Sequence, residues 1–257
     1  MIETMIQAAK AAGDILEKYY GQQFDIEHKG EKGFVSHVDK QAENIILSIL
    51  LKKYDYNIIA EESGIVENES EYCWVIDPLD GTSNFIRQIP FFCVSIALLK
   101  NNQLEAAVIY TPIYQELFYA KKNEGAFLNG KLITHTESGM PTIINCNYGY
   151  GKEAGQKYLE ALENIFPNYL TTRHFGSSAL ELAYLAAGRV DCFITYGDEL
   201  YDIAAGILIA KEAGCIASNW DGYPWKPEEK DLLVAPKLLH RELLSYLTKV
   251  GKLPNLE

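Results

Sequence analysis

The sequence predicts a mixed α/β protein whose first half is rich in antiparallel strands and whose second half alternates strands with helices. Two observations predict this fold class: apolar runs joined by turn signals in residues 1–140, and an alternation of strand and helix patterns in residues 141–257. A chain of 257 residues can form one large unit or two tightly packed halves. We expect one compact unit over residues 1–257.

The first half begins with helical patterns. Residues 2–20 carry their apolar side chains near one face of a helix, and a second helix begins near Asp39. Between them, Lys29–Phe34 is rich in Gly and Lys and predicts a mobile loop. Further on, Leu128–Lys131 contains Asn-Gly and predicts a two-residue hairpin turn. The predicted strands are Asn57–Ala60, Cys73–Ile76, Phe91–Leu99, Leu104–Tyr110 and Phe118–Ala120, with a turn at Asn101-Asn102.

In the second half, short apolar runs alternate with longer amphipathic or small-residue segments, as in βαβ units. The predicted strands are Ile143–Asn147, Leu170–Phe175 and Cys192–Thr195, and the predicted helices are Lys152–Phe166, Ser178–Ala187 and Tyr201–Ala213.

The most informative segment is Asp77–Asn84, which reads Asp-Pro-Leu-Asp-Gly-Thr-Ser-Asn. Asp77 is expected at the end of a buried strand, and Pro78 should prevent the strand ladder from continuing to Asp80. Residues 81–86 could open a short helix, whose first backbone N–H groups lack partners within the helix and form a site for phosphate. Carboxylates for hard cations beside an anion site are what metal-assisted phosphate chemistry requires.

Other acidic residues stand at matching positions, although each also has an ordinary structural explanation. Glu61 and Glu62 follow a predicted strand, where adjacent like charges suit a loop in water or a bound cation. Asp202 and Asp39 each stand at the start of a predicted helix, so helix capping alone accounts for them. Asp-Pro and Asp-Gly pairs are also common in turns. The whole set, rather than any one residue, favours a metal site.

These segments resemble the inositol monophosphatase family of magnesium-dependent phosphomonoesterases. Ala60–Ser63 looks like the family's first acidic motif, and Trp74–Phe85 matches its central signature nearly residue for residue. Tyr201–Gly206 looks like its C-terminal signature, with Tyr where Trp is more usual. Gly176–Ala179, followed by Ala186–Asp191, falls where the family has a substrate-contacting helix start and the next strand.

The resemblance extends from the first helix to about Leu239. It implies a layered α-β-α-β-α sandwich of the sugar-phosphatase type, in the α/β (α+β) class, with the active site where the two halves meet.

The resemblance also implies hydrolysis assisted by two or three Mg²⁺ ions, with Mn²⁺ as an alternative. Glu61, Asp77 and the backbone carbonyl of Leu79 would hold the first ion. Asp77, Asp80 and Asp202 would hold the second, so that Asp77 bridges the two. Such a pair of cations can stabilise both the attacking and the leaving oxygen of an in-line displacement.

Further roles follow from the same resemblance. Asp39 would accept a proton from the attacking water through the hydroxyl of Thr82. The backbone N–H groups of Gly81 and Thr82, together with Ser83, would hold the phosphate oxygens. Glu62 would support the metal ligands from behind or bind a third ion.

The residues expected beside the alcohol part of the substrate are Gly176, Ser177 and Ser178, with Asp202 nearby. Thr195 stands seven residues before Asp202, where inositol-cleaving members typically have a Glu that binds sugar hydroxyls. Losing that charge-assisted hydrogen bond would cost about 1.5–3 kcal/mol. Strict inositol specificity is therefore not expected, although Asp198 and Glu199 lie close by in a different register.

The expected substrate is a small phosphomonoester, such as inositol monophosphate or a related sugar or polyol phosphate. Histidinol phosphate, fructose bisphosphate and a nucleotide 3'-phosphate are alternatives within the same family. A non-catalytic sugar-phosphate sensor is an alternative of another class. The resemblance further implies a homodimer and sensitivity to lithium.

Composition restricts the partners. A net charge of −12 and a pI near 4.9 argue against nucleic acid, whose phosphates need a basic surface. The longest apolar run, Phe91–Leu99, is shorter than the roughly 20 residues that span a bilayer. No signal-peptide pattern begins the sequence. Five cysteines, odd in number and without a Cys-x-x-Cys pair, predict buried free thiols in a cytoplasmic protein.

One competing motif lies in the second half. Gly149–Ala154 fits Gly-x-Gly-x-x-Ala between a predicted strand and a predicted helix, as a dinucleotide fingerprint should. However, the next predicted strand, Leu170–Phe175, has no acidic residue near its end for a ribose hydroxyl, and its Arg173 suits only a phosphorylated ribose. A strand-to-helix turn is the simpler interpretation.

Overall fold

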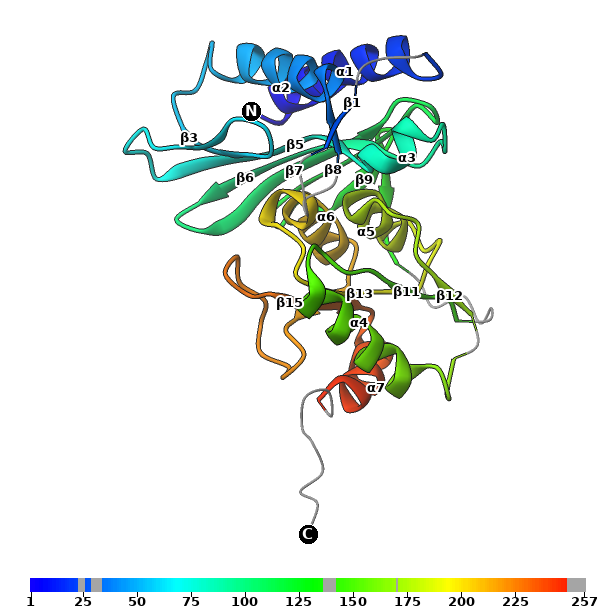
Figure 1. Cartoon of the computed structure of the whole chain (residues 1–257). Coiled ribbons are helices and arrows are strands. Elements are labelled where there is room, and N and C mark those ends of the chain that lie inside the picture. The colour runs from blue at the N-terminus through cyan, green and yellow to red at the C-terminus, as the bar shows by residue number, and fades with distance from the viewer. Residues whose placement is uncertain (23–25, 29–33, 136–141, 170, 249–257) are drawn as a thin grey trace.

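The computed structural model describes residues 1–22, 26–28, 34–135, 142–169 and 171–248. Five layers follow one another in Figure 1: a pair of helices, a large sheet, a second pair of helices, a smaller sheet and a third pair of helices. The helices of these three pairs are α1 (Ile2–Tyr19) with α2 (His37–Leu50), α5 (Ser178–Ala186) with α6 (Leu200–Glu212), and α4 (Lys152–Ile165) with α7 (Lys237–Leu247). The α-β-α-β-α sandwich implied by the sequence is therefore confirmed.

The first layer consists of α1, which has one apolar face, and α2, which begins at a capping box. Met5, Ala9 and Leu16 on α1 are buried, which is the apolar face that the sequence predicts. Helix α2 begins after Ser36, whose backbone N–H donates to Asp39 Oδ2 at 2.8 Å in a capping box. Asp39 thus lies in the first turn, with its carboxylate turned toward the start of its own helix.

The large sheet contains eight of the described strands, which are β3 (Asn57–Ala60), β4 (Gly64–Val66), β5 (Tyr72–Asp80), β6 (Cys93–Lys100), β7 (Gln103–Thr111), β8 (Glu116–Lys121), β9 (Ala126–Leu128) and β10 (Lys131–Ile133). Their order is β10-β9-β8-β7-β6-β5-β3-β4, and only β3 and β5 run parallel. Both two-residue turns that the sequence predicts are confirmed, because Asn101, Asn102, Asn129 and Gly130 all have positive φ.

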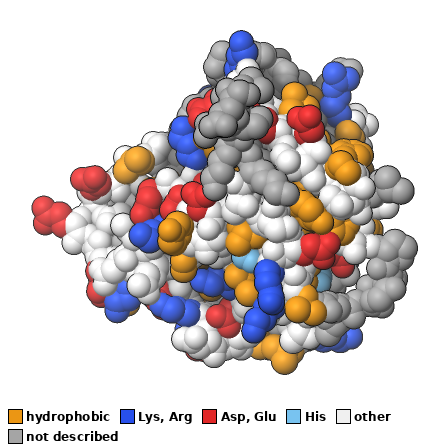
Figure 2. Space-filling model, turned by 90° about the horizontal axis from the view of Figure 1, so that it is seen from below, with side chains coloured by type: hydrophobic (Ala, Val, Ile, Leu, Met, Phe, Trp, Pro, Cys, Tyr) orange, Lys and Arg blue, Asp and Glu red, His pale blue; other side chains and the backbone are white. Residues whose placement is uncertain are grey.

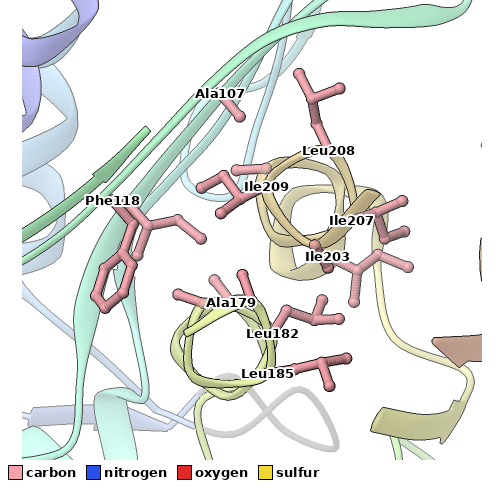
Figure 3. Close-up of a cluster of buried hydrophobic side chains, with 14 of the residues drawn as sticks. Ala107, Phe118, Ala179, Leu182, Leu185, Ile203, Ile207, Leu208 and Ile209 are labelled. Atoms are coloured by element: carbon pink, nitrogen blue, oxygen red, sulfur yellow. The ribbon is translucent and has the colours of Figure 1, made fainter. Parts of the chain in front are cut away.

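The central helices α5 and α6 pack between the two sheets. Figure 3 shows Ala179, Leu182 and Leu185 of α5 facing the apolar side chains of α6, with Phe118 of the large sheet beside them. These side chains are all buried, with at most 3% of any one exposed. Because both faces of this helix pair are covered, α5 and α6 are apolar nearly all round, and any charge on them requires a specific partner.

Five of the strands in the described residues form the smaller sheet, namely β11 (Ile144–Cys146), β12 (Thr172–Arg173), β13 (Cys192–Tyr196), β14 (Ile216–Ser218) and β15 (Asp231–Ala235). Their order is β12-β11-β13-β15-β14, with β11 parallel to both of its neighbours. Its outer face is covered by α4 and α7, which bury Ile165 and Leu243. The exposed side of that outer layer mixes acidic, basic and apolar side chains, as Figure 2 shows.

Several expectations need adjustment. The strand predicted at Leu170–Phe175 is reduced to β12, with residue 170 outside the described part. The loop predicted at Lys29–Phe34 also lies largely outside it, apart from Phe34, which begins strand β2 (Phe34–Ser36) opposite β1 (Ile26–His28). Strands β4, β14 and β15 and helix α7 were not predicted.

All five cysteines are free, four of them buried and Cys73 partly so. Among the helices that the structure describes, none combines the length and the apolar character needed to cross a membrane.

Candidate active site

A cavity of about 360 Å³ opens between the large-sheet half and the second half of the chain. Both halves contribute to its walls. The lining residues are Glu61, Asp77, Leu79, Asp80, Gly81, Thr82, Ser83 and Asn84 from the first half, and Asn147, Tyr148, Gly149, Tyr150, His174, Gly176, Ser178, Asp198 and Asp202 from the second. The position of this cavity agrees with the interface site implied by the sequence.

The end of β5 supplies two of the carboxylates. The pairing of β5 with β6 is regular up to Asp77, then shifts register and resumes at Asp80. Strand β5 therefore extends through both residues, whereas the sequence suggested that it would end at Asp77. Pro78 has no N–H to donate, and Asp77 Oδ1 accepts from the backbone N–H of Leu79 at 2.9 Å. The resulting bulge leaves both carboxylates beside the cavity.

The turn after β5 requires glycine. Gly81 has φ of +93° and precedes the short helix α3 (Thr82–Ile86). A Cβ at this position would also lie 3.0 Å from the backbone carbonyl oxygen of Phe91. Both observations exclude an ordinary side chain without strain. The chain therefore reaches the start of α3 with Gly81, Thr82 and Ser83 on the cavity wall.

The carboxylates of Asp77, Asp80 and Asp202 converge. Each offers an oxygen, and these three oxygens all lie within 4.8 Å of one another. Asp202 stands in the first turn of α6, where its Oδ2 accepts from the backbone N–H of Glu199 at 2.9 Å. Asp202 thus caps its own helix and also converges with Asp77 and Asp80. A cluster made only of carboxylate oxygens fits hard cations such as Mg²⁺.

Glu61 reaches the same cavity from the end of β3. Its loop is held by Glu43 of α2, whose two carboxylate oxygens accept the backbone N–H groups of Glu62 at 2.9 Å and Ser63 at 2.8 Å. Glu62 itself is not among the described residues that line the cavity. Glu43 is 3% exposed on the buried face of α2, so its charge is stabilised by these two donors.

Proton affinity in this cluster is abnormal. Burial raises the pKa of Asp77 well above its ordinary value, and the negative charge of Glu61 raises it further. Burial likewise raises the pKa of Asp80 to about 6. The pKa of Asp202 is raised by burial first and by the charge of Asp198 second. Carboxyls that repel one another in this way retain protons unless a cation neutralises them.

Thr82 connects the cavity with Asp39. Its Oγ1 lies 3.3 Å from Asp39 Oδ1 and 3.1 Å from the carbonyl oxygen of Leu79. Asp39 is fully buried, and its other oxygen accepts from the backbone and the hydroxyl of Ser36. The sequence-predicted pair of Thr82 and Asp39 is thus brought together from α3 and α2.

The start of α5 organises the wall from the second half. Ser177 does not face the cavity as the sequence suggested, because its hydroxyl donates to Asp80 Oδ2 at 2.6 Å. The backbone N–H of Ala179 donates to the same oxygen at 2.8 Å. Ser178 is on the wall, and its hydroxyl donates to Asp198 Oδ2 at 3.0 Å. The N-terminus of one helix thereby positions two carboxylates.

Thr195 also differs from expectation. It pairs with Leu232 inside the smaller sheet, is 1% exposed and is not among the described residues on the wall. Along β13 it shares a face with Phe193, which packs in the same apolar cluster as Leu232. The chain leaves the sheet at Gly197, with φ of +84°, and Asp198 then lines the cavity. The carboxylate that β13 and its loop bring to the cavity is therefore that of Asp198, which the sequence analysis mentioned only as lying close to Thr195 in a different register.

Glu181 was missed altogether. This α5 residue is fully buried, and one of its oxygens accepts the backbone N–H groups of Phe175 at 2.6 Å and Gly176 at 2.8 Å. Its other oxygen accepts from the side chains of Asn145 and Asn147. A single charge within an otherwise apolar helix was the sequence signal that could have identified it.

The glycine motif considered for dinucleotides has a different explanation. A Cβ on Gly149 would lie 1.8 Å from the carbonyl oxygen of Gly197, so only glycine permits this approach of two backbones. The backbone N–H of Gly149 donates to the carbonyl of Tyr196 at 2.9 Å. The motif thus brings Tyr148 and Tyr150 to the cavity wall.

The layered sandwich and this interface cavity place the chain among proteins of the sugar-phosphatase fold. It matches the inositol monophosphatase family over residues 1–252. It is 37% identical over 256 residues to an inositol-1-monophosphatase of Mesorhizobium japonicum, covering 97% of this chain and 96% of that protein. It is 41% identical over 229 residues to the Nus factor SuhB of Escherichia coli, covering 86% of each.

Solved structures agree with these relatives. The Thermotoga maritima IMPase has a TM-score of 0.86 and 32% sequence identity, with 96% of each chain covered. The SuhB protein of Bartonella henselae has a TM-score of 0.90 and 36% identity, covering 96% of this chain and 98% of that one. The chain therefore belongs to the inositol monophosphatase family.

Proposed function

We propose that this protein hydrolyses a small phosphomonoester to an alcohol and inorganic phosphate with the help of Mg²⁺. The observation that carries the proposal is the convergence of Asp77, Asp80 and Asp202 beside Thr82 in one interface cavity. Membership of the inositol monophosphatase family supports the same class of reaction.

The residues present suit two or three divalent cations, Mg²⁺ or alternatively Mn²⁺. Glu61, Asp77 and the Leu79 carbonyl would hold one ion, and Asp77, Asp80 and Asp202 a second. When bound, such cations acidify a water molecule and offset the charge on the transferring phosphoryl group. The depth of burial and the raised carboxyl pKa values indicate that this cluster is stable as carboxylates only with such charge compensation.

Thr82 and Asp39 would handle the proton. In this proposal the Thr82 hydroxyl receives a proton from the attacking water and passes its own to Asp39, whose Oδ1 lies 3.3 Å away. Asp39 is held for this by Ser36, so its carboxylate cannot rotate away without losing its cap. Glu62 would support the metal ligands or a third ion.

The phosphate oxygens would be bound by the backbone N–H groups of Gly81 and Thr82, with Ser83 on the same wall. Gly176 and Ser178, which also line the cavity, would lie toward the alcohol part of the substrate. Among the described lining residues there is no Lys or Arg, so bound cations would supply the positive potential that a phosphate needs.

The substrate proposed is inositol monophosphate or a related sugar or polyol phosphate. Relatives support this range: the Mesorhizobium protein is named an inositol-1-monophosphatase, and a structural neighbour with 29% identity is described as an inositol monophosphatase–fructose 1,6-bisphosphatase. Histidinol phosphate, fructose bisphosphate and a nucleotide 3'-phosphate are the alternatives within the class.

A second candidate is a role outside catalysis, as a sensor or partner protein. The name Nus factor carried by the Escherichia coli relative favours it. The test is phosphate release from a panel of phosphomonoesters, measured once with saturating Mg²⁺ and once with EDTA. Mg²⁺-dependent release supports the phosphatase, whereas no release from any substrate supports the non-catalytic role.

Two family properties complete the proposal. Lithium would inhibit by occupying a cation position, and a lithium titration without effect at saturating substrate would contradict this. The protein would form a homodimer, which light scattering at micromolar concentration would test against a mass of 28.9 kDa for one chain.

A further inference from the structure

The cavity has a second side whose chemistry the metal cluster does not use. Its side chains come from three separate segments of the second half, and they are Asn147, Tyr148, Tyr150, His174 and Asp198. In the described part of this wall, aromatic rings and one carboxylate occur without a Lys or Arg.

The aromatic part of the wall is packed in place. The Tyr148 ring meets His174 edge-on at 5.5 Å between centroids and lies 4.8 Å from Tyr158 of α4. Burial lowers the pKa of His174, so the imidazole adds no positive charge at neutral pH. This part of the wall therefore presents flat, uncharged surfaces to an occupant.

The Asp198 carboxylate is held at the start of α5. Asn147 Nδ2 donates to Ser178 Oγ at 2.6 Å, and Ser178 Oγ donates to Asp198 Oδ2 at 3.0 Å. Asn147 therefore donates to Ser178 and Ser178 donates to Asp198, so the Asp198 carboxylate is the final acceptor of this hydrogen-bonded chain. Above its pKa of about 7, the Asp198 carboxylate has about four acceptor positions, and the hydroxyls of Ser178 and Thr195 stabilise this charged form.

Asp198 lies outside the three carboxylates whose oxygens converge within 4.8 Å. It still lines the same cavity, on the wall that Ser178 shares. Its position corresponds to the alcohol side of a substrate whose phosphate lies at the converged carboxylates. Thr195 is buried in the smaller sheet and is not among the described lining residues, whereas Asp198 brings a carboxylate to this cavity three residues later.

On the basis of the proposed function, we infer that Asp198 determines specificity by accepting hydrogen bonds from the alcohol part of the substrate. The substrate class is a phosphomonoester that carries hydroxyl or ammonium donors and no second anionic group. A second phosphate or a carboxylate beside Asp198 would meet like charge, so this residue selects against bisphosphates.

The experiment compares wild type with Asp198→Asn on four substrates with Mg²⁺. Inositol 1-phosphate supplies hydroxyl donors, histidinol phosphate supplies an ammonium group, fructose 1,6-bisphosphate carries a second phosphate, and p-nitrophenyl phosphate has no donor. We expect KM for the preferred donor-bearing substrate to rise about 10- to 100-fold, as for loss of a charge-assisted hydrogen bond. KM for p-nitrophenyl phosphate should change less than about threefold, and KM for the bisphosphate should fall.

Two further variants make the result specific. Asp221→Asn removes one negative charge at an exposed position outside the cavity and should leave all four KM values unchanged. Asp198→Glu keeps the charge and should retain discrimination against the bisphosphate. A rise confined to inositol 1-phosphate would identify hydroxyl recognition, and one confined to histidinol phosphate would identify ammonium recognition.

Equal effects of Asp198→Asn on all four substrates, or none on the donor-bearing ones, would overturn the inference while leaving the phosphatase proposal intact. Wild type without Mg²⁺-dependent release from any substrate would overturn the proposed function and this inference with it. Melting curves of each variant verify that the KM values are measured on folded protein.

Discussion

The two sides of the cavity are built in different ways. The side that we propose for the cations takes Asp77, Asp80 and Thr82 from one continuous segment, although Asp80 is also held from α5 by Ser177 and Ala179. The alcohol side is assembled from loops near Tyr148, His174 and Asp198, which meet only because the smaller sheet and α5 bring them together. One local segment thus supplies most of the proposed cation side, with Asp202 added from α6, whereas the proposed alcohol side depends wholly on tertiary contacts.

The largest effect is expected on the cation side. Replacing Asp77 with Asn keeps its shape but removes the charge that the converged carboxylates share. We predict a loss of about 10²- to 10⁴-fold in kcat/KM for p-nitrophenyl phosphate at saturating Mg²⁺, because several kcal/mol of charge stabilisation disappear at 1.36 kcal/mol per tenfold.

The matched control is Asp55→Asn, which removes the same charge at an exposed position. It should keep wild-type activity. An Asp77→Asn enzyme that also keeps most of its Mg²⁺-dependent activity would show that the cation side has been assigned to the wrong residues.

A smaller effect is expected from the alcohol side. In Gly149→Ala the new Cβ would lie 1.8 Å from the Gly197 carbonyl oxygen, so the two backbones must separate and Asp198 must move. We predict a rise of about tenfold in KM for a donor-bearing substrate with a smaller change in kcat, and a loss of about 1–3 kcal/mol in the free energy of unfolding.

Gly155→Ala offers a contrasting change on α4, because nothing lies within 4 Å of the added Cβ. It should stabilise the protein by about 0.5–1 kcal/mol and leave KM unchanged. If Gly149→Ala behaves in the same way in a denaturant titration and in kinetics, the close approach of Gly149 to Gly197 has no role in the site.

The mildest test is the pH dependence of stability. Folded pKa values of about 6 for Asp80 and about 7 for Asp198 exceed the value near 4 of an unfolded carboxyl. The folded state therefore binds more protons between these values, and the metal-free protein should lose stability as the pH rises from about 4 to about 8.

Mg²⁺ should reverse that loss. At a concentration 100-fold above Kd it adds about 2.7 kcal/mol, or roughly 5–10 °C in Tm for a domain of this size. The Tm increase on adding Mg²⁺ should be larger at pH 8 than at pH 5, as scanning calorimetry would measure. An increase that is equal at both pH values would contradict the coupling between protons and cations.

What the sequence predicted follows the same division. The Asp77–Asn84 segment could be recognised from the sequence because Pro78 favours a break in the strand pairing and Gly81 favours a left-handed turn. The Asn101-Asn102 and Asn129-Gly130 turns were predictable for a similar local reason. Helix α6 and its first-turn Asp202 also followed from sequence pattern, since the helix is long and strongly apolar.

Other features depended on packing that no local pattern contains. Thr195 and Ser177 were expected on the wall, yet strand alternation turns Thr195 into the apolar layer and Ser177 is engaged by Asp80. Glu181 and Glu43 hold loops through hydrogen bonds from backbone N–H groups. The partner of Glu181 lies six residues earlier, at Phe175, and the partner of Glu43 lies twenty residues later, at Ser63. Asp198 reaches the cavity only because Gly197 redirects the chain as it leaves the sheet.

Anomalous scattering from a crystal soaked in Mn²⁺ tests whether the converged carboxylates hold divalent cations. We expect ions coordinated by the carboxylates of Asp77, Asp80 and Asp202, at the distances of about 2.0–2.2 Å that such oxygen ligands adopt. Ions bound only elsewhere, with these three side chains left uncoordinated, would contradict this expectation.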